Sequence, residues 1–186
     1  TSTYKFALLR SLCHIARTEH ASGIYDNDNA YVWLPLKRVS FYFLRFYFPF
    51  AKRKHSIKQS TGKDIAVKNF INELDYGPNE IFRLMSEYEN GQTIKVNSVL
   101  KKIKRTVYDQ PMKYCGEKPY SIFKYMNPDD AKAFIQISEP EMGMIGVPVE
   151  IWRDLTFFNN WIEDSLILQW AKLTEQINKG GKVKDY

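Results

Sequence analysis

The sequence predicts a mainly α-helical fold with a small antiparallel β-sheet, an α+β arrangement in a single module. Apolar residues recur at spacings of three and four through most of residues 1–110, which is the period of helices that bury one face. Prolines and glycines divide residues 111–146 into short segments, two of which alternate like strands. Residues 147–178 return to a helical pattern. With 186 residues, 44% of them hydrophobic, the chain can form one sizeable core.

The basic half of the module, residues 1–110, is expected to contain five helices and one short strand. A helix runs from Tyr4 to about His20, with Ser2 or Thr3 as its N-cap. After a strand at residues 31–34, Pro35 begins a mostly buried aromatic helix that extends to Pro49. The remaining helices are expected at residues 63–74, 78–90 and 94–108. The last of them has an apolar stripe formed by Val96, Val99, Leu100, Ile103 and Val107.

The second half is expected to contain the small sheet and one long helix. Within residues 111–146, Tyr120–Tyr125 and Ala133–Ile137 alternate as two antiparallel strands. The helix covers residues 147–178, and its apolar residues are too many for one exposed face. We therefore expect this helix to run through the centre of the domain. Residues 179–186 have the composition of a linker towards a missing C-terminal domain, so the sequence suggests a fragment of a longer chain.

Positive and negative charges are separated along the chain, whose net charge is +6. Residues 37–68 contain nine lysines and arginines and one acidic residue, which gives 9 − 1 = +8. Residues 127–175 contain three basic and nine acidic residues, which gives 3 − 9 = −6. A molecule with this asymmetry turns its basic side towards a polyanion such as a nucleic acid.

The composition argues against membrane and secreted proteins. The longest apolar and aromatic run, residues 39–50, is interrupted by Arg45 and Pro49 and is shorter than the ~20 residues of a membrane-spanning helix. The first residues do not resemble a signal peptide. Cys13 and Cys115 form no disulfide framework. We expect a cytoplasmic protein with no membrane partner.

Few residues in this span suit catalysis. The three histidines and two cysteines include no pair at zinc-site spacing. Cys13 is expected to be a small core residue and His14 a partly buried one. One alternative is a carboxylate-bound Mg²⁺ near the predicted sheet, although a solvated acidic loop is the simpler interpretation. The carboxylates concerned are Asp129, Asp130, Glu139, Glu141 and Glu150. No cofactor is predicted within this span.

Two basic clusters are the predicted nucleic-acid-binding residues. The first lies before and at the start of the helix expected at residues 63–74, whose free N–H groups favour an anion. The second lies opposite the apolar stripe of the helix expected at residues 94–108, where it can reach the phosphates of a DNA duplex. A merely solvated surface is the alternative for each. The first comprises Lys52, Arg53, Lys54, Lys58 and Lys63, and the second comprises Lys101, Lys102, Lys104 and Arg105.

Four separated segments resemble the N-terminal helical region of bacterial HNH-type endonucleases. Tyr4–Leu12 is similar to the opening helix of that family, and Tyr42–Pro49 is similar to an aromatic segment that ends in proline. Ile57–Lys63 resembles a glutamine-asparagine-threonine-glycine turn, and Leu166–Ala171 resembles a late helix that carries a tryptophan. The four segments occur in the order of the family over nearly the whole chain.

The resemblance implies DNA cleavage in restriction or anti-phage defence. In the family, zinc-bound cysteines and a ββα-metal centre follow this region, so Zn or Mg is expected in a nuclease domain beyond this span. The chain would then be a non-catalytic module that binds and positions DNA. The alternative is a protein-interaction module that docks a partner protein of a defence complex through its acidic, aromatic C-terminal half, without contacting DNA.

Overall fold

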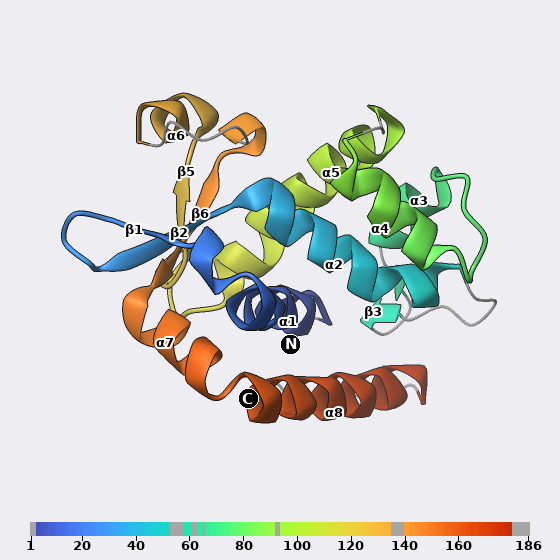
Figure 1. The fold of residues 1–186 in the computed structure, drawn as a ribbon. Coiled ribbons are helices and arrows are strands. Elements are labelled where there is room, and N and C mark those ends of the chain that lie inside the picture. The colour runs from blue at the N-terminus through green and yellow to red at the C-terminus, as the bar shows by residue number, and fades with distance from the viewer. Residues whose placement is uncertain are drawn as a thin grey trace.

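The computed structural model describes residues 3–52, 58–60, 63–64, 66–91, 94–134 and 140–179. Helices pack around one another to form the body of the molecule, and a small sheet stands at one end of it (Figure 1). The sheet has four strands, all paired antiparallel. The predicted mainly α fold with a small antiparallel sheet is therefore confirmed.

Eight α-helices lie in the described part of the chain. They are α1 (Thr3–Thr18), α2 (Leu36–Ala51), α3 (Ala66–Asn72), α4 (Ile81–Glu89), α5 (Ile94–Val107), α6 (Pro128–Phe134), α7 (Val149–Phe157) and α8 (Asn159–Asn178). Short 3-10 turns occur at His20–Ser22 and Pro140–Met142, and a π-helical turn at Tyr108–Met112 follows α5. The helices predicted at residues 4–20, 35–49, 78–90 and 94–108 correspond to α1, α2, α4 and α5.

Helix α2 forms the centre of the molecule. It packs against α1, α3 and α5, and eleven of its sixteen residues are buried. Aromatic side chains on most sides of α2 account for this burial, because a helix with no polar face has to be surrounded by protein. The hydroxyl of Tyr47 donates to Oγ1 of Thr3 at 2.9 Å, which satisfies two buried polar groups between α1 and α2.

The sheet has the strand order β1 (Ile24–Tyr25), β2 (Tyr31–Pro35), β6 (Met144–Pro148) and β5 (Lys124–Met126). The predicted strand at residues 31–34 is confirmed as β2. Gly143 precedes β6 with a left-handed φ of +75°, and a Cβ there would lie 2.3 Å from the carbonyl oxygen of Met126. Glycine is therefore required where the chain enters this strand.

The two strands predicted within residues 111–146 are largely wrong. Of the first, only Lys124 and Tyr125 belong to a strand, β5. The second prediction began at Ala133, but Ala133 and Phe134 end helix α6, and residues 135–137 lie outside the described residues. Asn127 caps the N-terminus of this helix. Its Oδ1 accepts hydrogen bonds from the backbone N–H groups of Asp129 and Asp130.

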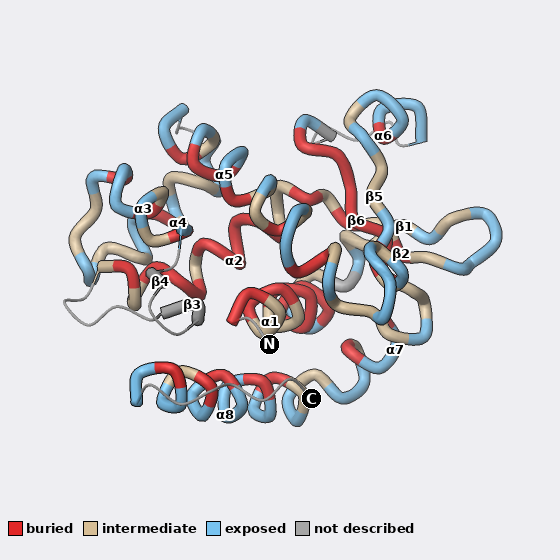
Figure 2. Tube along the Cα trace, turned by 180° about the vertical axis from the view of Figure 1, so that it is seen from behind, coloured by how far each residue is buried: buried red, intermediate tan, exposed pale blue. Residues whose placement is uncertain are grey.

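The expected central helix at residues 147–178 is also wrong. Its first two residues end strand β6, and the remainder forms two helices, α7 and α8, that meet at an elbow at Phe158. Helix α8 lies along the outside of the body beside α1, and only its inner side is buried (Figures 1 and 2). No helix in the described ranges is both long and apolar enough to cross a membrane.

The helix predicted at residues 63–74 begins later than expected. Strands β3 (Lys58–Ser60) and β4 (Lys63–Asp64) pair as a short antiparallel hairpin, and α3 begins only at Ala66. Ser60 and Lys63, predicted to lie at a helix N-terminus that binds an anion, belong to strands β3 and β4 instead, and residues 61–62 lie outside the described residues.

Candidate functional site

The first predicted basic cluster does not form one exposed surface in the described residues. Lys52 is half-buried, and its Nζ donates to the backbone carbonyl of Leu74 at 2.7 Å. Burial lowers the pKa of this lysine. Arg53 and Lys54 lie outside the described residues, and for Lys58 and Lys63 the structure describes only the backbone of the β3–β4 hairpin. Lys52 thus serves to hold the end of α2 against the end of α3.

The second predicted cluster lies on α5, but its side chains point in different directions. Nζ of Lys102 lies 2.6 Å from Oε2 of Glu73, beyond the end of α3. Nζ of Lys104 donates to the hydroxyl of Tyr125 in β5 at 2.9 Å. Residues 102 and 104 are ~200° apart around a helix, so the two lysines flank α5 on opposite sides. Lys101 and Arg105, one turn apart, share the outward face between them.

The charged residues on the polar side of α5 are all cationic. The helix carries five basic residues and no acidic residue, namely Lys95, Lys101, Lys102, Lys104 and Arg105. All five residues of its predicted apolar stripe are buried. Helix α5 therefore fixes its basic side outward by packing its apolar side against α2. We call this outer side, from Lys95 to Arg105, the α5 basic face.

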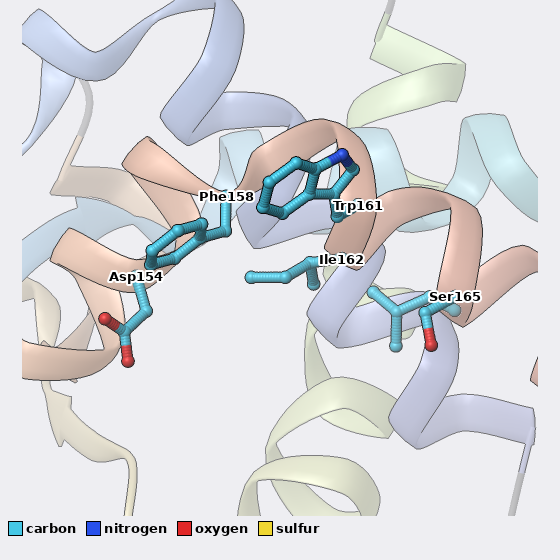
Figure 3. A pocket seen from close by; sticks show the side chains of 6 residues that line it. Asp154, Phe158, Trp161, Ile162 and Ser165 are labelled. Carbon is cyan, nitrogen blue, oxygen red and sulfur yellow. The ribbon is translucent and has the colours of Figure 1, made fainter.

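A second exposed feature is an apolar pocket at the elbow between α7 and α8 (Figure 3). It has a volume of about 450 Å³. The aromatic rings of Phe158 and Trp161 stack at its edge, with centroids 6.0 Å apart and planes at 16°. Trp161 is 75% exposed, which is unusual for so large an apolar side chain. The lining residues are Asp154, Phe158, Trp161, Ile162, Ser165 and Leu166.

Helix α8 has apolar residues on two opposite sides. Its inner side contacts α1 through a buried set with alternating spacings of three and four, comprising Glu163, Leu166, Trp170, Leu173 and Ile177. Trp161 and Leu168 lie seven positions apart on the outer side, where Leu168 is 54% exposed. We call the elbow pocket and this outer side the α8 outer face. The excess of apolar residues noted in the sequence is explained by these two sides.

Charged residues fasten the inner side of α8 to α1. Oε1 of Glu163 lies 3.2 Å from Nε of Arg10, and Oε2 lies 3.0 Å from Nη1 of Arg17. In addition, Sγ of Cys13 donates to the backbone carbonyl of Asn159 at 3.2 Å. These contacts fix the first two turns of α8, and with them the elbow, on the body of the domain.

Cys13 is a small core residue, as predicted, and His14, predicted to be partly buried, is buried beside the core. Burial raises the pKa of the Cys13 thiol to about 11, so the sulfur stays protonated and is a poor nucleophile. His14 lies between Nη2 of Arg17 at 3.3 Å and Nη1 of Arg45 at 3.2 Å. Burial, followed by these two cations, lowers the pKa of His14 to about 4. The imidazole is therefore neutral at physiological pH.

The described residues do not fit a metal centre. No group of three or more His, Cys, Asp or Glu side chains gathers anywhere in the ranges that the structure covers. Of the proposed magnesium carboxylates, Asp129 and Asp130 lie in the exposed first turn of α6, and Glu150 lies on α7. Glu141 is in the 3-10 turn before β6, and Glu139 is outside the described residues.

Comparison with known families places the chain within one of them. The family described as "Domain of unknown function (DUF8808)" matches residues 1–185, nearly the full length. Searches of curated proteins and of solved structures found no match. The chain, with its cationic α5 and its two-sided α8, belongs to the DUF8808 family.

Proposed function

We propose that this chain is the DNA-positioning module of an HNH-type endonuclease that acts in restriction or anti-phage defence. The observation that carries the proposal is the α5 basic face, on a helix with five basic residues and no acidic residue. Lys95 and Lys101 are exposed on it. Lys102 and Arg105 are paired with carboxylates of neighbouring segments, and Lys104 is bonded to Tyr125. Lysine and arginine side chains that neutralise phosphates release counterions, and this release drives DNA binding without reading sequence. The resemblance of four segments to the N-terminal region of HNH-type endonucleases supports the same function.

In this proposal the chain holds the duplex, and cleavage belongs to a metal centre that the described residues do not supply. Zinc or magnesium would be bound there, by residues other than those of the two surfaces described above. The two cysteines are free, which is consistent with action in the reducing cytoplasm. The acidic residues of α7 and α8 would repel DNA and so leave α5 as the docking side.

The test is a salt titration of duplex binding with two charge-matched variants. Lys101→Glu/Arg105→Glu reverses two exposed charges on α5, and Lys172→Glu/Lys179→Glu reverses two exposed charges on α8. Each double variant changes the net charge by −4, so a general effect of net charge is the same in both. The wild-type chain should bind duplex DNA with an affinity that falls steeply with salt concentration.

The α5 variant should lose affinity by about tenfold or more and reduce the slope of log K against log salt by about 2. The α8 variant should remain close to the wild type. Equal losses in both variants, or wild-type binding that does not respond to salt, would contradict DNA positioning by α5.

A specific observation favours a second function, docking of a protein partner on the α8 outer face. An exposed stacked pair, Phe158 and Trp161, stands over an apolar pocket, and Asp154 at the pocket and Asp164 nearby are exposed acids. This surface suits an amphipathic helix with apolar residues on one side and basic residues beside them. We infer such a segment as the partner.

A pair of peptides tests this second function. A helical peptide of leucine and lysine should bind and shift the fluorescence of Trp161 to shorter wavelength, whereas the same peptide with glutamate for lysine should not bind. Trp161→Phe should remove the spectral shift, because the other described tryptophans lie elsewhere. Binding of both peptides alike, or of neither, would argue against a docking site of this chemistry.

A further inference from the structure

A groove lies beside the α5 basic face, where the start of α1, α3 and the end of α5 meet. Its volume of about 510 Å³ is within the range of roughly 300–1,000 Å³ that is typical of small-molecule sites. The apolar part of its lining includes Tyr4 and Phe70. The polar part comes from the last turns of α5 and from the π-helical turn that follows, through Lys102, Arg105, Asp109 and Gln110.

The polar groups of the groove are only partly engaged with one another. Nε of Arg105 lies 3.5 Å from Oδ2 of Asp109, which is long for a charged hydrogen bond, and the Arg105 side chain is 86% exposed. Gln110 is exposed. Lys102 is already held by Glu73, and its Nζ lies over the Phe70 ring at 5.7 Å from the ring centroid, so a base can stack only on the rest of that ring or after Lys102 has moved. Arg105 is therefore the groove cation that is most able to turn towards an anion.

The π-helical turn explains how Asp109 and Gln110 reach the groove. Pro111 lies inside this turn and has no backbone N–H, so it cannot continue the regular hydrogen bonds of α5. The chain widens to a π-helix over Tyr108–Met112, and both Asp109 and Gln110 line the groove. Single π-helical turns of this kind occur often at functional sites.

We propose that this groove binds one unstacked nucleotide, with the base against Phe70, the phosphate on Arg105 and the base edge on Asp109 and Gln110. An aromatic side chain is a stacking surface for any base, and a guanidinium is a strong ligand for phosphate. A carboxylate only accepts hydrogen bonds, so Asp109 favours bases that carry an exocyclic amino group. Adenine, cytosine and guanine carry such a group, whereas the only donor on the thymine edge, N3–H, lies between two carbonyl oxygens that repel a carboxylate. The inference rests on the proposed DNA-binding function and adds a site for a single nucleotide to it.

The experiment is an NMR titration of the full chain with the four deoxynucleoside monophosphates, read from backbone amide shifts. Amides of Phe70 and of residues 105–110 should shift, and the amino-bearing nucleotides should bind at least about tenfold more tightly than thymidine monophosphate. Arg105→Gln should lower the affinity for all four nucleotides by about tenfold. Asp109→Asn should reduce the preference over thymidine, because an amide can donate as well as accept.

Lys101→Gln is the matched control, since Lys101 is exposed on the same helix but does not line the groove. This variant should keep its affinity for mononucleotides and lose affinity for duplex DNA. Arg105, Asp109 and Lys101 are exposed, so all three variants should keep the helical circular dichroism of the wild type.

The outcomes separate this inference from the proposed function. Amide shifts outside the groove, or equal affinity for all four nucleotides, would overturn the nucleotide site. If duplex binding through α5 persists in the same samples, the DNA-positioning function stands without it. If the chain binds neither mononucleotides nor duplex DNA, both are overturned.

Discussion

Helices α5 and α8 both lie on the surface of the domain and both bury one side, but their outer sides differ in chemistry. The outer side of α5 is cationic, with five basic residues and no acidic residue on the helix. The outer side of α8 carries Trp161 and Leu168 among exposed polar residues, whereas Glu163 is buried on the inner side. One helix is thus suited to a polyanion and the other to an apolar partner.

One side of each helix is buried, and the other side carries the proposed binding surface. The apolar stripe of α5 fixes its orientation against α2, and this orientation makes the basic side face outward. Helix α8 is fixed by an apolar set and by the Glu163 ion pairs, and Trp161 and Leu168 on its second apolar side remain largely exposed. Changes on the inner sides should therefore affect stability, and changes on the outer sides should affect binding alone.

The largest effect is expected for an inner residue of α5. Leu100 is fully buried against the core, so Leu100→Ala removes buried apolar contacts and leaves a cavity. We expect a loss of about 3–4 kcal/mol in the free energy of unfolding, measured by urea denaturation. The same substitution on the outer side of α8, Leu168→Ala, should cost less than about 0.5 kcal/mol. Similar losses in the two variants would contradict the assignment of inner and outer sides.

The next effect concerns the ion pairs that fasten α8. Glu163→Gln leaves Arg10 and Arg17 without their carboxylate in a mostly buried position. The expected loss of unfolding free energy is about 2–3 kcal/mol, reduced from the value for a fully buried pair because Arg17 is partly exposed. Asp164→Asn, on the exposed side one position away, is the control and should be nearly neutral. A Glu163 variant as stable as the control would show that the apolar contacts alone hold α8.

A pH effect of intermediate size is expected where α8 meets α1 and α2. The pKa of His14 is about 4 in the folded chain and ~6.5 when unfolded, so the unfolded chain binds the proton more readily. Stability is therefore complete above pH 6.5 and falls as the pH is lowered towards 4, by about 2 kcal/mol between pH 7.5 and pH 5. Arg17, Arg45, Glu19 and Glu163 are the charged groups that act on this ring.

His14→Gln isolates this contribution, because it removes the titrating ring while the carboxylates of the protein remain. The difference in unfolding free energy between wild type and variant should change by about 2 kcal/mol over the same pH range. A constant difference between pH 7.5 and pH 5 would contradict the lowered pKa of His14.

The smallest effect on stability is expected for the α8 outer face. Trp161→Ala should change the unfolding free energy by less than about 0.5 kcal/mol, because three quarters of this side chain is exposed. The same variant should no longer bind the leucine–lysine peptide, as measured by calorimetric titration. Loss of both stability and peptide binding would mean that Trp161 belongs to the fold and not to a docking surface.

Features set by local periodicity could be predicted from the sequence. The stripe from Val96 to Val107 repeats at helical spacing, and every predicted member is buried. The aromatic run of α2 likewise predicted a buried helix. It did not predict that α2 is the centre of the fold, a place that was expected for residues 147–178. Strand β6 was missed because it is buried throughout except at Pro148, and a continuously buried strand shows no alternation.

Features set by distant contacts could not be predicted in this way. The lysines of the second basic cluster form a compact group in the sequence, but Lys102 is paired with a residue 29 positions away, and Lys104 with one 21 positions away. The elbow at Phe158 follows no proline or glycine. The N-cap of α8 is Phe158, which makes no side-chain cap bond, so no capping residue marks the elbow in the sequence. The Nδ2 group of Asn159 donates to the carbonyl of Thr156 in the last turn of α7 at 2.6 Å.

The central claim is that α5, and not α8, meets DNA, and lysine footprinting tests it most directly. The chain is acetylated with and without a short DNA duplex at low salt, and modification at each lysine is measured by mass spectrometry. The account predicts that DNA protects Lys95 and Lys101, that Lys172 and Lys179 stay equally reactive, and that the protection disappears at high salt. Protection of the α8 lysines instead, or equal reactivity of all four with and without DNA, would contradict it.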